Sequence, residues 1–271
     1  MAFSDFHVHT RFSDGEHSVR ECIEAAHQKG LFTLGISDHS FTPFDTSYCM
    51  RPETGLAHYE ETVREEAARA KALYGMPVLL GLEHDFGSVI DRERYDYTIG
   101  SVHYILKGED IFPVDDSEHD QLKGITQVFG GNKLDFVKRY FEQVVLHAEK
   151  NKPTFMGHFD IVNKYSLIKE DEAYFAIAKE ALAETVKHVP LFEISAGPML
   201  RGLKDHPYPA LPLLQELKAL GGKVILSSDT HSATTLCAHF QEMLTILKKV
   251  GFTHVCTLQK GGISEIELDT L

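Results

Sequence analysis

The sequence predicts an α/β protein built as a TIM-like barrel, with residues 1–271 in one domain. Short apolar segments typical of buried strands alternate with amphipathic segments of helical period, the pattern of parallel strands joined by crossover helices. Roughly seven or eight such units fit the chain, which favours a barrel over an open doubly wound sheet. No glycine-rich phosphate loop follows any strand, which excludes the common nucleotide-binding folds.

The composition is that of an ordinary globular protein with many histidines. Hydrophobic residues make up 43% of the chain and charged residues 25%, and 16 residues are histidine. The net charge of -13 argues against binding of nucleic acid, which relies on clustered lysine and arginine. The chain has neither an apolar run of about eighteen residues nor a signal-peptide pattern. We therefore expect a cytoplasmic protein with no membrane association.

The cysteines do not form a recognisable framework. Cys22, Cys49, Cys237 and Cys256 are scattered, with no Cys-x-x-Cys pair among them. We expect reduced thiols rather than disulfides or a cysteine-based zinc site.

Start and stop signals mark the first elements after the opening strand. Ser18-Val19-Arg20-Glu21 is a capping box, which predicts a helix from there to Lys29 with Gly30 as its stop. The elements expected next are a strand over residues 31–37, a loop to about Gly55, a helix over residues 56–74, and strands over residues 77–83 and 97–103.

The segment from about residue 106 to residue 131 is acidic and shows no sustained period, so we expect a long loop or insertion there. Beyond it the alternation resumes. We expect helices over residues 132–149, 171–187, up to Leu220, and 236–250, strands over residues 153–158, 189–194, 223–231 and 254–258, and a polar loop over residues 195–209.

Metal-competent side chains stand at the end of nearly every expected strand. His7 and His9 are one residue apart, so on a strand they point the same way and can hold one ion. The full set is His7, His9, His39, Glu83, His103, His158, Asp229 and His231. In a barrel these strand ends converge on the face where active sites are built. Each residue alone could be a helix cap or a hydrogen-bonded structural residue, but caps and packing do not explain the whole set.

The ligand types indicate the chemistry. Imidazole and carboxylate without thiolate suit Zn, Mn or Fe, and the donors are too many for one ion, so we expect two to three divalent ions. Such clusters clamp phosphate oxygens and lower the pKa of a bound water towards 7, which produces a hydroxide nucleophile. The sequence therefore predicts a hydrolase.

The order of the motifs resembles the polymerase and histidinol phosphatase (PHP) superfamily over almost the whole chain. The motifs are His7-Val8-His9, Ser37-Asp38-His39, Gly81-Leu82-Glu83, Gly100-Ser101-Val102-His103, Gly157-His158-Phe159-Asp160 and Ser228-Asp229-Thr230-His231. The resemblance implies a distorted (β/α)7 barrel with a trinuclear metal centre. It also implies ligand sets: His7, His9, Glu83 and Asp229 for the first ion, Glu83, His103 and His158 for the second, and His39 and His231 for the third.

One ligand of the third ion departs from the family pattern. Many members have a histidine six residues after the second histidine of His-x-His, where this chain has Gly15. Asp14 and His17 flank that position. Members with Ser-Asp in this loop favour Asp14, and His17 remains the alternative. Either residue could instead cap the helix that begins at Ser18.

The later motifs resemble the histidinol-phosphate phosphatases of histidine biosynthesis. Phe192-Glu193-Ile194-Ser195-Ala196-Gly197 is followed by Arg201 and by Pro207-Tyr208-Pro209. Arg201 resembles the family's phosphate-binding arginine, whose planar guanidinium can contact two oxygens. Where those enzymes commonly carry another arginine, this chain has Asn163 with Lys164 beside it, and lysine binds phosphate as a point charge. Glu193 could meet the substrate's amino group or orient the Arg201 loop.

We therefore expect hydrolysis of a small phosphate monoester, L-histidinol phosphate, with Asp14, His231 and Arg201 as catalytic residues and Arg201, Lys164 and Glu193 as substrate contacts. His119, Asp115 and Asp116 could form a lid, although a solvated acidic loop is the simpler interpretation. A PHP phosphoesterase acting on nucleotides or nucleic-acid ends is the alternative enzyme. A noncatalytic metal-binding module is the alternative of another class.

Overall fold

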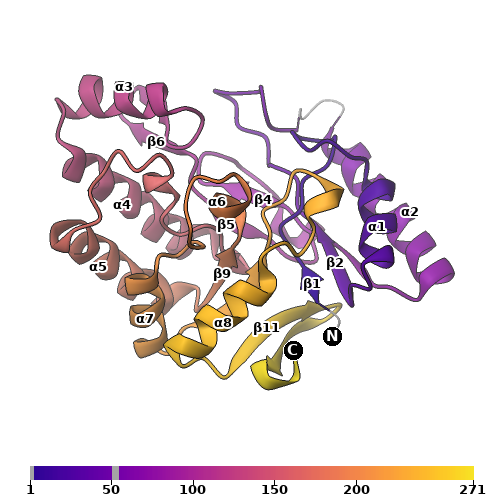
Figure 1. Ribbon diagram of the computed structural model, residues 1–271. Coiled ribbons are helices and arrows are strands. Elements are labelled where there is room, and N and C mark those ends of the chain that lie inside the picture. The colour runs from indigo at the N-terminus through magenta and orange to yellow at the C-terminus, as the bar shows by residue number, and fades with distance from the viewer. Residues whose placement is uncertain (1–2, 51–54) are drawn as a thin grey trace.

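The computed structural model describes residues 3–50 and 55–271 and has an α/β fold (Figure 1). The strands are β1 (Ser4–Asp5), β2 (Thr33–Ile36), β3 (Val78–Leu80), β4 (Glu83–Asp85), β5 (Ile99–Ser101), β6 (Tyr104–Lys107), β7 (Asp110–Pro113), β8 (Phe155–Met156), β9 (Leu191–Ser195), β10 (Lys223–Ser227), β11 (His254–Gln259) and β12 (Gly262–Glu267). The α-helices are α1 (Val19–Gln28), α2 (Leu56–Tyr74), α3 (Glu118–Phe129), α4 (Lys133–Asn151), α5 (Glu172–His188), α6 (Gly197–Leu200), α7 (Leu211–Ala219) and α8 (Phe240–Val250).

The strands of the described residues pair into three sheets. Their strand orders are β1-β2-β3, β12-β11-β10-β9-β8-β5-β4 and β6-β7. The pairs are parallel except β11–β12 and β6–β7. Single parallel bridges, Val8 to Thr230 and His39 to Glu83, link the first two sheets where the strands end. The predicted α/β class is confirmed, whereas the ladders found do not form one continuous closed sheet.

The helices cover the sheets on opposite sides. In Figure 1, α1 and α2 lie on one side of the strands and α4, α5 and α7 on the other. The predicted capping box is present at the start of α1, where Ser18 accepts from the Glu21 amide and Glu21 accepts from the Ser18 amide. The helix α2 has the expected bounds and ends at Gly75, whose φ of 68° favours glycine.

Of the two alternatives for residues 106–131, a long loop is wrong and an insertion with its own secondary structure is present. This segment holds most of the β6–β7 hairpin and the helix α3. Gly108, with φ of 64°, makes the hairpin turn, and Ser117 caps α3 through the Asp120 amide. The two strands are only four residues long, too short to show a period. The loop expected at residues 195–209 likewise contains the one-turn helix α6.

Tyr97 joins the opening strand to the middle of the fold. Its hydroxyl donates to the Phe6 carbonyl at 2.7 Å, one residue before His7. A β-carbon at Gly35 or at Gly81 would lie 2.2 Å from the tyrosine ring or its hydroxyl. Both glycines therefore make room for a buried side chain that holds the backbone of the first histidine motif in place.

Two features bear on the protein's environment. All four cysteines are free thiols, as expected. Among the helices of the described residues, none has the length and apolar character needed to cross a membrane.

Candidate metal centre

Three strand ends bring together the residues expected around the first ion. His7 and His9 follow β1, Glu83 lies in β4 and Asp229 follows β10. Glu83 Oε2 is 3.3 Å from His7 Nε2 and 3.5 Å from His9 Nε2, and Asp229 Oδ1 is 3.6 and 3.5 Å from the same nitrogens. Asp229 has a φ of 51°, a strained conformation that turns its carboxylate towards this group.

The second oxygen of Glu83 faces the residues expected around the second ion. Glu83 Oε1 lies 3.3 Å from His103 Nε2 and 2.9 Å from His158 Nε2. His39 Nδ1 lies 2.8 Å from Glu83 Oε2. Glu83 is therefore the common member of the cluster, with one oxygen towards each half, as a bridging carboxylate requires.

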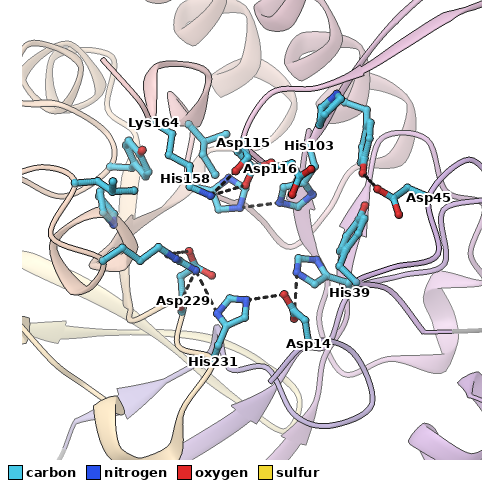
Figure 2. Close-up of a pocket in the computed structure, with 18 of the residues that line it drawn as sticks. Asp14, His39, Asp45, His103, Asp115, Asp116, His158, Lys164, Asp229 and His231 are labelled. Atoms are coloured by element: carbon cyan, nitrogen blue, oxygen red, sulfur yellow. Dashed lines mark hydrogen bonds and ion pairs between the residues drawn. The ribbon is translucent and has the colours of Figure 1, made fainter. Parts of the chain in front are cut away.

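Asp14 lies among the residues expected around the third ion, and His17 lies outside them. Asp14 Oδ2 is 3.1 Å from His231 Nε2, and Oδ1 is 3.7 Å from both His39 Nε2 and His9 Nδ1. Figure 2 shows the Asp14 carboxylate between His39 and His231. His17 Nδ1 instead accepts from the Ala233 amide at 3.3 Å.

The backbone explains why residue 15 carries no side chain. A β-carbon at Gly15 would lie 2.5 Å from the His9 carbonyl, so a histidine there would push the loop away. The loop is held by Asp38, whose carboxylate accepts from the Thr10 amide at 2.8 Å and from the Ser13 hydroxyl at 2.6 Å. Residue 14 is consequently the position from which this loop reaches the centre.

Two buried carboxylates orient the histidines from behind. Glu193 Oε2 is 2.8 Å from His7 Nδ1 and accepts from the Ser227 hydroxyl, while Oε1 accepts from the His158 amide. Asp85 Oδ2 is 3.0 Å from His103 Nδ1. Such partners fix the tautomer and direction of a ligating imidazole.

These contacts locate Glu193 and add one residue. Glu193 is buried with both oxygens occupied, and it is not among the residues that line the cavity described below. The sequence interpretation missed Asp85. Its signal was available, because Asp85 is two residues after Glu83 on one strand and so points to the same side.

The side chains fit a group of divalent cations. His7 Nε2, both ring nitrogens of His9 and Glu83 Oε2 are buried and have no hydrogen-bond partner in residues 3–50 and 55–271. Leaving such atoms unpaired is costly, and an ion at the centre would satisfy them. Four sets of residues each bring three or four ligand atoms within 4.8 Å of one another. The sets are His7, His9 and Asp229; His7, Glu83 and His158; His39, Glu83 and His103; and His9, Asp14, His39 and His231.

The pKa shifts favour positive charge at the centre. Burial disfavours the carboxylate of Glu83, but His39, His7 and His103 hold its pKa well below the ordinary value. Burial likewise opposes ionisation of Asp229, and Arg201 and His7 lower its pKa. Burial and the neighbouring His231 and His39 lower the pKa of His9 to about 3. Burial also opposes protonation of His7, His39 and His103, but Glu83 and other nearby carboxylates raise their pKa, and a bound cation would displace those protons.

A cavity of about 270 Å³ opens over the centre. Arg201 lines it, with Nη1 3.0 Å from Asp229 Oδ2 and Nη2 3.2 Å from His231 Nδ1. Lys164 also lines it and donates to Asp115 at 2.6 Å (carbonyl) and 3.2 Å (carboxylate). Asn163, beside it, is buried and does not line the cavity. The wall is completed by acidic and aromatic side chains, which are Asp45, Asp115, Asp116, Tyr48, Tyr104 and Tyr208.

The segment expected as a possible lid is partly in this wall. Asp115 and Asp116 line the cavity, and Tyr165 holds their backbone by donating to both carbonyls at 2.7 Å. His119 is an exposed residue of α3 and is not among the lining residues found.

Comparison with known proteins places the chain in a family. The PHP domain family model matches residues 5–196. The histidinol-phosphatase of Lactococcus lactis is 27% identical over 273 residues, covering 93% of each chain. The "probable histidinol-phosphatase" of Schizosaccharomyces pombe is 25% identical over 267 residues, covering 90% of this chain and 84% of the relative.

A solved structure shares the fold. It is histidinol phosphate phosphatase from Lactococcus lactis in complex with zinc, L-histidinol and phosphate, with a TM-score of 0.71 at 22% identity, covering 97% of this chain and 98% of that one. The family model alone spans most of the described strands and the residues from His7 to His158. This chain belongs to the PHP domain family.

Proposed function

We propose that this protein is a metal-dependent phosphatase that hydrolyses L-histidinol phosphate to L-histidinol and phosphate. The observation that carries the proposal is the position of Arg201, on the wall of a cavity whose floor is a cluster of six histidines and three carboxylates. A cation cluster and a guanidinium facing one space suit a phosphate monoester, which has two negative charges.

The proposed ligands follow the three groups of contacts. His7, His9, Glu83 and Asp229 would hold one ion, Glu83, His103 and His158 a second, and Asp14, His39 and His231 a third, with His9 within reach of the last group. Zn, Mn and Fe all suit these ligands. When bound, the ions polarise the phosphate and supply a nucleophilic hydroxide from water.

The chain's own residues bind the ester and orient its leaving group. Arg201 contacts two phosphate oxygens, and Lys164 adds a second positive charge. Asp14 and His231 are the most exposed members of the cluster, with side chains 33% and 28% accessible and their polar atoms 3.1 Å apart. Their place at the cavity mouth puts them beside the departing alkoxide, which they orient as it leaves.

Two further observations support a cationic alcohol as the leaving group. Asp45 and Asp116 line the cavity, and the side chain of Asp116 has no hydrogen bond or ion pair among the described residues. A free carboxylate there can meet an ammonium or imidazolium group. Relatives named histidinol-phosphatase match 90% or more of this chain, and the Lactococcus lactis structure binds histidinol and phosphate.

The proposal includes the wider architecture. Residues 1–271 form one domain in which seven parallel strands enclose a distorted barrel around the centre, and the enzyme works in the cytoplasm. The support is the pair of bridges at Val8–Thr230 and His39–Glu83, which join the sheets beside the metal ligands, and the four free thiols.

The test is an activity screen on protein whose metal content has been measured. We expect release of inorganic phosphate from histidinol phosphate in preference to nucleoside monophosphates, and no cleavage of single-stranded DNA. Absence of release from histidinol phosphate defeats the substrate assignment, and selective cleavage of nucleotides or DNA ends supports the alternative phosphoesterase. A fully metallated protein inactive on all esters is a noncatalytic module.

A further inference from the structure

Two positively charged side chains from separate loops converge on the cavity. Lys164 lies between β8 and α5, and Arg201 between β9 and α7. Because both side chains are positively charged, they repel each other. Asp115 partners Lys164, and Asp229 partners Arg201, but neither contact joins the two loops. Asp160 already ties the first loop to the second, where it accepts from the Ala210 amide at 3.0 Å before α7. A link closer in sequence to Lys164 and Arg201 would fix the two cations on one anion.

Glu170 supplies that link. Its Oε1 accepts from Lys204 Nζ at 2.8 Å and from Asn163 Nδ2 at 2.7 Å. Lys204 is three residues after Arg201, and Asn163 directly precedes Lys164. The Asn163 side chain also closes its own loop, because Oδ1 accepts from the Ile168 amide at 3.2 Å.

The link is sheltered from water, which makes its hydrogen bonds effective. Asn163 is 2% exposed, the Lys204 side chain 6% and the Glu170 side chain 26%. A charge-assisted bond in such surroundings contributes more than a surface ion pair. None of the three residues is among those found to line the cavity, so they do not touch a bound ester directly.

We propose that Glu170 is a positioning residue that ties the Asn163–Lys164 segment to the Arg201–Lys204 segment, so that Lys164 and Arg201 meet one phosphate group. The inference rests on the anion site of the proposed function. It also assigns a use to Asn163, which anchors the loop rather than contacting the phosphate.

The test measures binding of inorganic phosphate to metal-loaded protein by calorimetry, alongside steady-state kinetics. Glu170→Ala should weaken phosphate binding about threefold to thirtyfold, the range of coupling through a supporting contact. KM should rise by a similar factor and kcat should change less. Glu170→Gln keeps an oxygen for both partners and should recover most of the affinity.

Glu216→Ala is the matched control. Glu216 forms an ion pair with Lys179 at 3.2 Å between α7 and α5. The Glu216 side chain is 33% exposed, close to the 26% of Glu170, although Lys179 is more exposed than Lys204. The phosphate affinity of Glu216→Ala should stay within about twofold of the parent protein, the effect of an ordinary exposed pair. Because Lys204 and Glu170 form one link, Glu170→Ala combined with Lys204→Met should bind phosphate no more weakly than Glu170→Ala alone.

The outcomes separate the inference from the proposed function. If Glu170→Ala binds phosphate as the parent does, or loses no more than Glu216→Ala, the inference is wrong even where histidinol phosphate is hydrolysed. Additive losses in the double variant also overturn it. If the parent binds phosphate but hydrolyses no ester, the proposed function fails, and a selective loss in Glu170→Ala still supports the positioning role. A parent that binds no phosphate contradicts the inference.

Discussion

Arg201 and Asp229 meet across Gly197, where there is no room for a β-carbon. The guanidinium Nη1 is 3.0 Å from Asp229 Oδ2. A β-carbon at residue 197 would lie 2.4 Å from that oxygen and 2.6 Å from that nitrogen. The glycine therefore permits the contact that keeps the guanidinium beside the metal ligands.

Gly197→Ala should separate these two side chains and lower kcat/KM roughly tenfold to a hundredfold, the value of a charge-assisted contact. The residue does not have a left-handed φ, so the backbone itself tolerates alanine. Steady-state kinetics and thermal unfolding check this. Arg201→Lys should show a comparable loss, and a Gly197→Ala enzyme with parental kinetics contradicts the steric account.

Glu83→Gln should abolish most turnover while keeping the fold. The amide has the same shape but loses the charge that faces His7, His39, His103 and His158. We expect a fall in kcat of at least about a hundredfold, together with reduced metal content by elemental analysis and an unchanged circular dichroism spectrum. Full metal content together with parental turnover would contradict the bridging role of Glu83. Glu265→Gln, in a surface pair with Lys223, is the control.

Asp14→Asn should lose the third ion, whereas His17→Gln should retain it. Asp14 faces His9, His39 and His231, and its pKa is lowered because these imidazoles outweigh burial. The His17 ring instead accepts from the Ala233 amide, through Nδ1. Metal stoichiometry after dialysis separates the two residues. Loss of metal from the His17 variant alone would reverse the assignment.

Glu193→Gln should weaken metal binding about tenfold to a hundredfold, the usual cost of changing a partner of a ligating histidine. The reason is the loss of charge at 2.8 Å from His7 Nδ1. With metal in excess, KM for histidinol phosphate should be unchanged, because Glu193 does not line the cavity. A raised KM at saturating metal would instead indicate contact with the substrate. Metal titration and kinetics decide between them.

His147 should make the fold sensitive to acid. It is buried, with Nε2 2.7 Å from the His84 carbonyl and Nδ1 2.7 Å from Asn151. Burial and the nearby His84 lower the pKa of His147 from 6.5 to about 4. The folded state therefore binds fewer protons than the unfolded state in this window. The contribution of neutral His147 to the free energy of unfolding is therefore fully present above pH 6.5 and is lost as the pH falls towards 4.

Between pH 7 and pH 5 this residue should cost roughly 2 kcal/mol of the free energy of unfolding. Urea unfolding of metal-free protein at both pH values measures it. His147→Gln lacks the titrating group and should lose correspondingly less than the parent over the same interval. Equal losses in both proteins would show that His147 does not titrate in this way.

Much of the fold and of the metal centre can be predicted from local signals. Ser18 and Glu21 mark the start of α1, and Gly75 marks the end of α2, because caps depend on neighbouring residues only. The ligand candidates were found because parallel strands bring their C-terminal ends together. The sequence does not predict the β6–β7 hairpin, because strands of four residues are too short to show a period and their pairing depends on tertiary packing.

Local patterns in the sequence predict the α/β order of elements and the candidate donors. Which of these side chains meet, and what supports them, follows from the tertiary structure. Glu193 contacts His7 from behind, Asp14 rather than His17 faces His231, and Asn163 turns to Glu170. These choices depend on contacts between residues far apart in the chain, and the direction of a buried side chain is set by the partners that satisfy its polar atoms.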